Sequence, residues 1–273
     1  MIPTTVVQLI DKQINLPQDH QLWTTLEGEN PGGSIKDRMV LPELLQLKKS
    51  GIDNISEISA GSTALSIAFY AQKYDLKCQL FVPFDIDEGL KKKLVQNGAY
   101  LTECIPSEAY QKYENFCQSS NTWRFNQMQR KDLRLHYQKW AEEQLAPALP
   151  KLDFVIGAVG TGHSLLGIKI ALTPKFGCVV AEPRPGEAVY GIRNLSQQSF
   201  GPDDPCELSL IEHRHELEKT QYFSSQIIES NHGTIAISDS FRLTLGVAIS
   251  FLNKIKTPAK VLIVGSHCKF TEK

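Results

Sequence analysis

The sequence has no surplus of charge of either sign and no long hydrophobic run. Its 273 residues include 29 Lys and Arg against 30 Asp and Glu, which gives a formal net charge of -1. Because binding along a nucleic-acid backbone needs excess positive charge to displace counterions, we expect no nucleic-acid partner. No apolar run approaches the roughly 18 to 20 residues of a membrane-spanning helix, so we expect no membrane partner either.

The sequence also lacks a leader-like start and paired cysteines. Residues 1–5 show no basic stretch followed by an apolar one, which predicts a cytoplasmic protein. His213 and His215 flank Arg214 without a third ligand at a suitable spacing, so we predict no metal site. The cysteines are widely spaced, form no C-x-x-C pair and partly lie in apolar runs, so we expect buried free thiols. They are Cys78, Cys104, Cys117, Cys178, Cys206 and Cys268.

The composition is that of an ordinary globular protein, with 41% hydrophobic and 22% charged residues. Apolar strand-like runs alternate with helical patterns along most of the chain. The apolar runs are 6–9, 22–26, 55–58, 79–82, 154–156, 177–181 and 260–264, and the helical patterns are 64–73, 87–97, 133–144, 164–172 and 241–254. Strands this apolar have no wet face, so the pattern predicts an α/β fold with two three-layer α/β/α lobes and mostly parallel sheets. Residues 199–218 show no periodicity and predict an irregular surface segment.

Ligands of parallel sheets bind beyond the carboxyl ends of the strands, so we expect the functional residues in loops that follow a strand and lead into a helix. In residues 30–38, a Pro-Gly-Gly turn leads into Ser34, which can cap a helix with Asp37 three residues later. A capped helix start with Lys36 in solvent would explain this pattern without any function.

The whole string from Glu27 to Arg38, however, closely resembles the lysine loop of the fold-type II pyridoxal-phosphate enzymes, the family of cysteine synthase, cystathionine β-synthase and the tryptophan synthase β-chain. Other segments resemble the same family in the same order. They are residues 4–9 (opening strand), 59–64 (substrate loop), 160–164 (phosphate loop), 180–183 (strand end) and 264–270 (ring-nitrogen segment).

The resemblance implies pyridoxal 5'-phosphate as cofactor and Lys36 as the catalytic residue that forms the Schiff base with it. The chemistry suits a lysine in a closed cleft, because desolvation lowers the ammonium pKa and leaves a nucleophilic amine. The resemblance also implies cofactor-binding roles for Ser62, Gly160, Thr161, Gly162, His163, Ser164 and Ser266, and substrate-binding roles for Ser59, Ala60, Gly61, Thr63 and Gln127.

The segment from Gly160 to Ser164 follows an apolar strand and opens a helix, where backbone N–H groups attract a phosphate. A dinucleotide-binding loop is the competing interpretation. It needs G-x-G-x-x-G, but Leu165 stands at the third glycine, and Glu182 is the only acid that ends a strand about 20 residues further on. One phosphate fits this loop better than two.

Several positions depart from the family pattern. Thr5 stands where proline is usual, Ala60 and Ala64 replace a hydroxyl residue and a glycine, and Ser62 replaces asparagine. Ser62 retains one hydrogen bond for the cofactor oxygen, whereas His163, in place of a glycine, either contacts the phosphate or crowds it.

These observations predict a smaller mobile lobe over residues 37–128, a larger lobe of 1–36 plus 129–273, the cofactor between them, and a homodimer. The predicted reaction is β-elimination or β-replacement on a small, three-carbon amino-acid substrate, with Lys36 as general base. A neutral Ser266 hydroxyl at the ring nitrogen would favour elimination over transamination. The alternative is a catalytically degenerate relative that binds the cofactor or a partner.

Overall fold

The computed structural model describes residues 2–120, 122–173, 175–201 and 203–271. The chain forms two compact units, one of residues 1–30 and 131–273 and the other of residues 31–130. We call them unit 1 and unit 2. Residues 31–38 of the lysine loop and the loop after residue 58 belong to unit 2, whereas residues 27–30 and the loop at residues 160–164 belong to unit 1. That a smaller lobe with boundaries at residues 37 and 128 is mobile remains a prediction.

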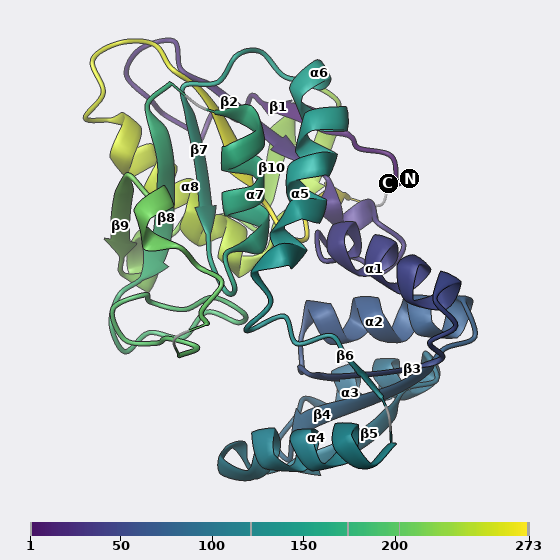
Figure 1. The fold of residues 1–273 in the computed structure, drawn as a ribbon. Helices are drawn as coiled ribbons and strands as arrows, with labels where there is room; N and C mark the ends of the chain where they lie inside the picture. Colours follow the sequence, from purple (N-terminus) through teal and green to yellow (C-terminus); the bar gives the residue numbers. More distant parts are fainter. Residues whose placement is uncertain (1, 121, 174, 202, 272–273) are drawn as a thin grey trace. The chain divides into compact units, whose positions relative to one another are not determined.

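Unit 2 is a parallel sheet with helices on both faces (Figure 1). The strand order is β5-β4-β3-β6, and each neighbouring pair is parallel. Connections between parallel strands are right-handed, so the direction of each step across the sheet decides which face its helix covers. The chain steps from β3 to β4 to β5 in one direction, which places α2 and α3 on one face. It then returns to β6 beside β3, which places α4 on the other face. The elements are α1 (Asp37–Lys49), β3 (Asn54–Ile58), α2 (Ser62–Lys73), β4 (Lys77–Pro83), α3 (Glu88–Gln96), β5 (Tyr100–Cys104), α4 (Pro106–Ser120) and β6 (Trp123–Arg124).

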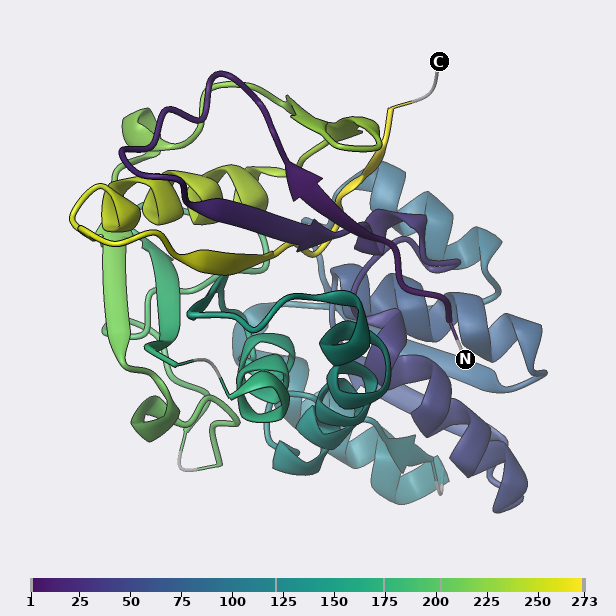
Figure 2. The same ribbon diagram turned by 90° about the horizontal axis from the view of Figure 1, so that it is seen from above.

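Unit 1 contains a mixed sheet in the order β13-β11-β10-β1-β2-β12-β7-β8-β9. The strands from β2 to β9 in this order are parallel, and those from β13 to β2 are antiparallel. The strands are β1 (Val6–Leu9), β2 (Gln21–Thr25), β7 (Phe154–Ala158), β8 (Gly177–Pro183), β9 (His213–Leu217), β10 (Ile227–Ser230), β11 (Gly233–Ala236), β12 (Lys260–Val264) and β13 (Lys269–Phe270). Figure 2 shows helices α5 (Arg134–Trp140) and α7 (His163–Leu172) on one side of the parallel part and α8 (Asp239–Leu252) on the other.

Each apolar run predicted as a strand is a strand, with slightly different ends, and the α/β class with parallel sheets is confirmed. The helical pattern 133–144 is α5 followed by a π-helical segment, Ala141–Leu145, and the short α6 (Ala146–Ala148). The prediction of an irregular segment over 199–218 is wrong at its end, where β9 pairs with β8. In β9 only Leu217 is buried, because an edge strand has little apolar signal.

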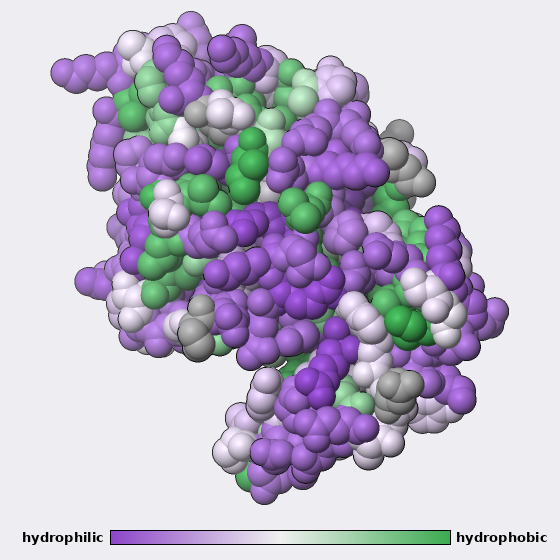
Figure 3. Space-filling model, in the orientation of Figure 1, coloured by the Kyte–Doolittle hydropathy of each residue, from purple (hydrophilic) through white to green (hydrophobic). Residues whose placement is uncertain are grey.

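The face seen in Figure 3 is mainly hydrophilic, with hydrophobic residues in small separate patches. None of the helices in the described ranges has the length and apolar character needed to cross a bilayer. All six cysteines are buried free thiols, as predicted. Over the same ranges, no three His, Cys, Asp or Glu side chains gather as metal ligands.

Candidate functional site

The lysine loop of unit 2 ends in the first turn of α1. Lys36 has helical backbone angles at the N-cap position, and its N–H donates to the Ser34 hydroxyl over 3.2 Å. Ser34 therefore caps the turn before α1 rather than the helix itself. The sequence predicts that Asp37 completes this cap. Its carboxylate instead accepts a hydrogen bond from the Gly32 N–H at 2.6 Å.

Asp37 ties this loop to α2. The carboxylate has no exposed surface, and it accepts hydrogen bonds from the Ser66 hydroxyl at 2.7 Å and the Tyr70 hydroxyl at 3.1 Å. A Cβ on Gly32 would lie 2.4 Å from the Asp37 carboxylate, so only glycine lets the loop approach this closely. Three donors on one buried carboxylate hold the loop in a single conformation.

Lys36 is chemically distinct from a surface lysine. Its side chain is half-buried, and desolvation lowers the pKa of its ammonium to about 8. A substantial fraction is then neutral near physiological pH, and the neutral amine is the nucleophilic form.

The loop between β3 and α2 carries the residues predicted to bind substrate. Ser59, Ala60, Gly61 and Ser62 are half-buried, and α2 begins at Ser62 after an extended Gly61. The structure also brings the distant Gln127 to this loop, where its amide oxygen accepts from the Thr63 hydroxyl at 2.7 Å. Whether Gln127 contacts substrate remains a prediction.

Glu57 is a residue of this region that sequence reasoning missed. It lies in β3 with 1% of its surface exposed, and its carboxyl accepts from the Gln127 backbone N–H at 3.3 Å. Burial raises the pKa of Glu57 to about 8, although hydrogen bonds from Gln127, Asn126 and Ile58 oppose this shift. An acid between Ser56 and Ile58, inside the predicted strand 55–58, was the available signal.

The loop Gly160–Ser164 of unit 1 connects β7 to α7. Gly162 is the N-cap residue with a φ of 85°, and a Cβ there would lie 3.1 Å from Cys206. A Cβ on Gly160 would lie 2.5 Å from the Gly191 carbonyl oxygen. Both glycines are thus required by backbone conformation or close packing, and the N–H groups that open α7 form a helix N-terminus suited to an anion.

The side chains of this loop differ in exposure. His163 is 2% exposed, whereas Thr161 and Ser164 are half-buried. A buried imidazole at the first residue of α7 makes His163 part of the packing of the loop, and its contact with a phosphate remains a prediction.

The dinucleotide interpretation fails at Glu182. This acid has no exposed surface and receives two hydrogen bonds from Arg214, from Nε at 2.6 Å and from Nη2 at 2.7 Å. It also accepts from the Leu195 N–H at 3.3 Å. A carboxylate occupied in this way is unsuited to binding a ribose hydroxyl.

Ser266 lies in the bend that follows β12 and is half-buried. A Cβ on the preceding Gly265 would lie 2.6 Å from Cys268 Sγ and 2.7 Å from the Phe241 ring, so the bend is tightly packed. The assignment of Ser266 to a ring nitrogen remains a prediction.

Comparisons with known proteins agree with this description. The model of a family described as pyridoxal-phosphate dependent enzyme matches residues 2–236. A cysteine synthase from Flavobacterium sp. is 31% identical over 186 residues, which cover 64% of this chain and 60% of the relative. The matched part therefore spans less than two thirds of that enzyme.

Solved structures show the same fold. An O-acetylserine dependent cystathionine β-synthase from Helicobacter pylori has a TM-score of 0.79 and 20% identity, with 97% of this chain and 92% of the other covered. A hydrogen sulfide-producing enzyme from Fusobacterium nucleatum also has a TM-score of 0.79, with 19% identity and coverage of 97% and 94%. At these identities the likeness establishes the fold alone.

Proposed function

Because the chain belongs to the family of pyridoxal-phosphate dependent enzymes, we propose that it catalyses β-elimination or β-replacement on a three-carbon amino acid, as a cysteine synthase-like or cysteine desulfhydrase-like lyase or transferase. One observation carries this proposal above the others: a half-buried Lys36, with its pKa lowered to about 8, lies in a loop fixed by Asp37.

The described residues fit the family's cofactor. Lys36 offers an amine for the aldehyde carbon, and the N-terminus of α7 offers N–H groups for the phosphate. Ser62 would donate to the phenolic oxygen and Ser266 to the ring nitrogen. When bound, pyridoxal phosphate supplies an electron sink for negative charge at the substrate α-carbon.

The substrate would be held by its carboxylate. The first turn of α2, which begins at Ser62, would offer its backbone N–H groups to the carboxylate, and the Thr63 hydroxyl is held in this turn by its hydrogen bond to Gln127. Lys36 Nζ would take the α-proton, since an amine with a pKa of about 8 accepts and returns a proton near neutral pH. In elimination the substrate loses this proton and its β-substituent. In replacement a nucleophile takes the vacated β-position and Lys36 would return a proton to the α-carbon, so only the β-substituent is exchanged.

The relatives support this reaction class. Their names describe a cysteine synthase, an O-acetylserine dependent cystathionine β-synthase and a hydrogen sulfide-producing enzyme. The first two names contain cysteine and O-acetylserine, which are three-carbon amino acids with a substituent at the β-position. We further propose that the protein is cytoplasmic and that it is a homodimer. Light scattering tests the homodimer directly, and a mass equal to one chain would exclude it.

Turnover assays test the proposal. We expect protein loaded with pyridoxal phosphate to convert O-acetylserine and sulfide to cysteine and acetate, or cysteine and water to pyruvate, ammonia and sulfide, with Lys36→Ala as the inactive control. If the cofactor binds Lys36 and none of serine, cysteine and O-acetylserine is consumed, the chain is a degenerate relative that binds without catalysing.

A further inference from the structure

A segment of unit 1 that follows β8 packs on the loop Gly160–Ser164. We call residues 189–201 and 203–206 the clamp segment. The backbone N–H of Arg193 donates to the Val159 carbonyl at 2.9 Å. The Gly191 carbonyl lies so close to Gly160 that a Cβ on Gly160 would collide with it. The backbones of the two segments are therefore in direct contact.

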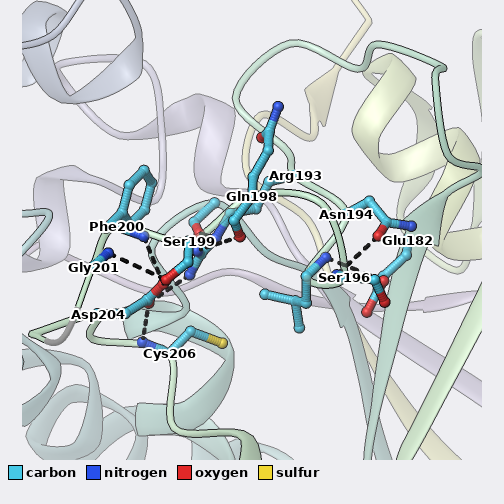
Figure 4. A network of polar contacts seen from close by, with 12 residues as sticks. Glu182, Arg193, Asn194, Ser196, Gln198, Ser199, Phe200, Gly201, Asp204 and Cys206 are labelled. Atoms are coloured by element: carbon cyan, nitrogen blue, oxygen red, sulfur yellow. Dashed lines mark hydrogen bonds and ion pairs between the residues drawn. The ribbon is translucent and has the colours of Figure 1, made fainter.

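The Arg193 side chain strengthens this contact. Its Nε donates to the Gly160 carbonyl at 2.6 Å, and its Nη1 donates to the Gln198 carbonyl at 3.0 Å. The Asp204 carboxylate accepts from Nη1 at 2.5 Å and from Nη2 at 2.6 Å (Figure 4). The guanidinium lies 4.2 Å from the centre of the Phe200 ring, and Arg193 is only 3% exposed. Such a guanidinium has one orientation.

Asp204 is itself fixed from several sides. It accepts from the Phe200 and Cys206 backbone N–H groups at 3.0 and 2.9 Å, and from the Ser199 hydroxyl at 3.3 Å. Burial alone would raise its pKa, but Arg193 and these N–H groups outweigh burial and hold the pKa of Asp204 at about 2. The carboxylate therefore stays charged and neutralises Arg193.

The direction of the Gly160 carbonyl matters for anion binding. In a trans peptide the carbonyl of one residue and the N–H of the next point in opposite directions. When Arg193 binds the Gly160 carbonyl, the Thr161 N–H must point away from the clamp segment. Without this bond the peptide could turn its carbonyl toward the phosphate and repel it.

We propose that Arg193 and Asp204 form a positioning pair that orients the Thr161 N–H toward the cofactor phosphate, without Arg193 itself binding the phosphate. The inference rests on the proposed function of the loop Gly160–Ser164. Arg193 acts through geometry, since its charge is matched by Asp204 and four of its five N–H donors bind Gly160, Gln198 and Asp204.

The test compares pyridoxal phosphate with 5'-deoxypyridoxal, which carries the same aldehyde without the phosphate. The measured quantity is the ratio of their dissociation constants for the apoprotein, read from absorbance. In Arg193→Lys we expect the preference for pyridoxal phosphate to fall about 10-fold or more, the usual effect of a lost hydrogen bond to a charged group. Binding of 5'-deoxypyridoxal should not change.

Arg242→Lys is the matched control, because Arg242 of α8 also donates from Nε to a backbone carbonyl, that of Phe223 at 2.7 Å, and pairs with an aspartate, Asp239, at 2.9 Å, but its partners lie outside the clamp segment. We expect it to keep the wild-type preference. An Arg193→Lys protein with the wild-type preference, or equal losses in both variants, would overturn the inference.

Asp204→Asn keeps the inference testable if Arg193→Lys does not fold. Its amide still accepts one bond from Arg193, so we expect a smaller fall in the preference and a shifted ³¹P resonance of the bound phosphate. An increased preference would contradict a positioning role, because it would show Arg193 attracting the phosphate by charge, and an unchanged preference would contradict it by showing that Asp204 does not position Arg193. A wild-type protein without any preference for pyridoxal phosphate would instead overturn the phosphate assignment itself, and the inference with it.

Discussion

The lysine loop of unit 2 and the loop Gly160–Ser164 of unit 1 are each held by one buried charged side chain, but the two charges have opposite signs. Asp37 accepts from Gly32, Ser66 and Tyr70, which are neutral donors. Arg193 donates to the Gly160 carbonyl and is neutralised by Asp204.

The sign of the anchoring charge determines which backbone groups of each loop remain for a ligand. The carboxylate anchor consumes an N–H group of its loop, that of Gly32, which suits a loop whose working group is the Lys36 side chain. A guanidinium anchor consumes a carbonyl and leaves N–H groups, which suits a loop that receives an anion. The sign of the anchoring charge thus matches the proposed role of each loop.

The largest expected effect is on the working group of the lysine loop. Lys36→Ala should lower turnover on the order of 10³-fold or more, because both the covalent link and the proton acceptor are lost. Steady-state rates with saturating cofactor measure this loss. Retention of more than a tenth of the wild-type rate would remove Lys36 from catalysis.

Glu57 extends the comparison to a second buried carboxyl of unit 2, which faces Cys78 of β4, Tyr113 of α4 and Gln127. Its pKa of about 8 in the folded protein exceeds the ordinary 4.5. Between these values the folded protein keeps a proton that the unfolded chain releases, so the unfolding free energy should fall as pH rises from about 4.5 to 8 and then level off.

Urea unfolding of the apoprotein across this pH range measures the slope. Glu57→Gln should flatten it, whereas Glu103→Gln, at a more exposed acid of β5 paired with Lys91, should not. Equal slopes in wild type and Glu57→Gln would show that Glu57 is ionised throughout.

A smaller effect is expected where the anchor of the lysine loop is changed. Asp37→Asn should lower the free energy of unfolding by about 2 to 3 kcal/mol, since three donors lose a charged acceptor, and Ser66→Ala by about 1 kcal/mol. Each should also slow attachment of the cofactor to Lys36, which stopped-flow absorbance follows. If attachment is unchanged in Asp37→Asn, the anchor serves stability alone.

The parallel core and the two loops could be read from the sequence, because apolar runs and glycine turns are local signals. Lys36 was predicted from the resemblance of its whole loop to the family's lysine loop, because the local pattern alone indicates only a capped helix start. The anchors were not, since Ser66 lies 29 residues from Asp37 and Asp204 lies 11 from Arg193 within a segment without periodicity. Such pairs exist only after the chain folds.

The smallest expected effect concerns Ser62, which stands where the family has asparagine. Ser62→Ala should shift the absorbance maximum of the bound cofactor slightly and reduce turnover about 2- to 10-fold, as expected for one lost hydrogen bond. Ser59→Ala serves as a neighbouring control with an unchanged spectrum. A Ser62→Ala protein identical to wild type in spectrum and rate would make Ser62 only the first residue of α2.

Reduction with borohydride and peptide mapping tests the central claim most directly. Wild-type protein incubated with pyridoxal phosphate and then reduced should carry one pyridoxyl group, on the peptide that contains Lys36, and Lys36→Ala should carry none there. A reduced adduct on another lysine, or no adduct at all, would contradict the proposed active site.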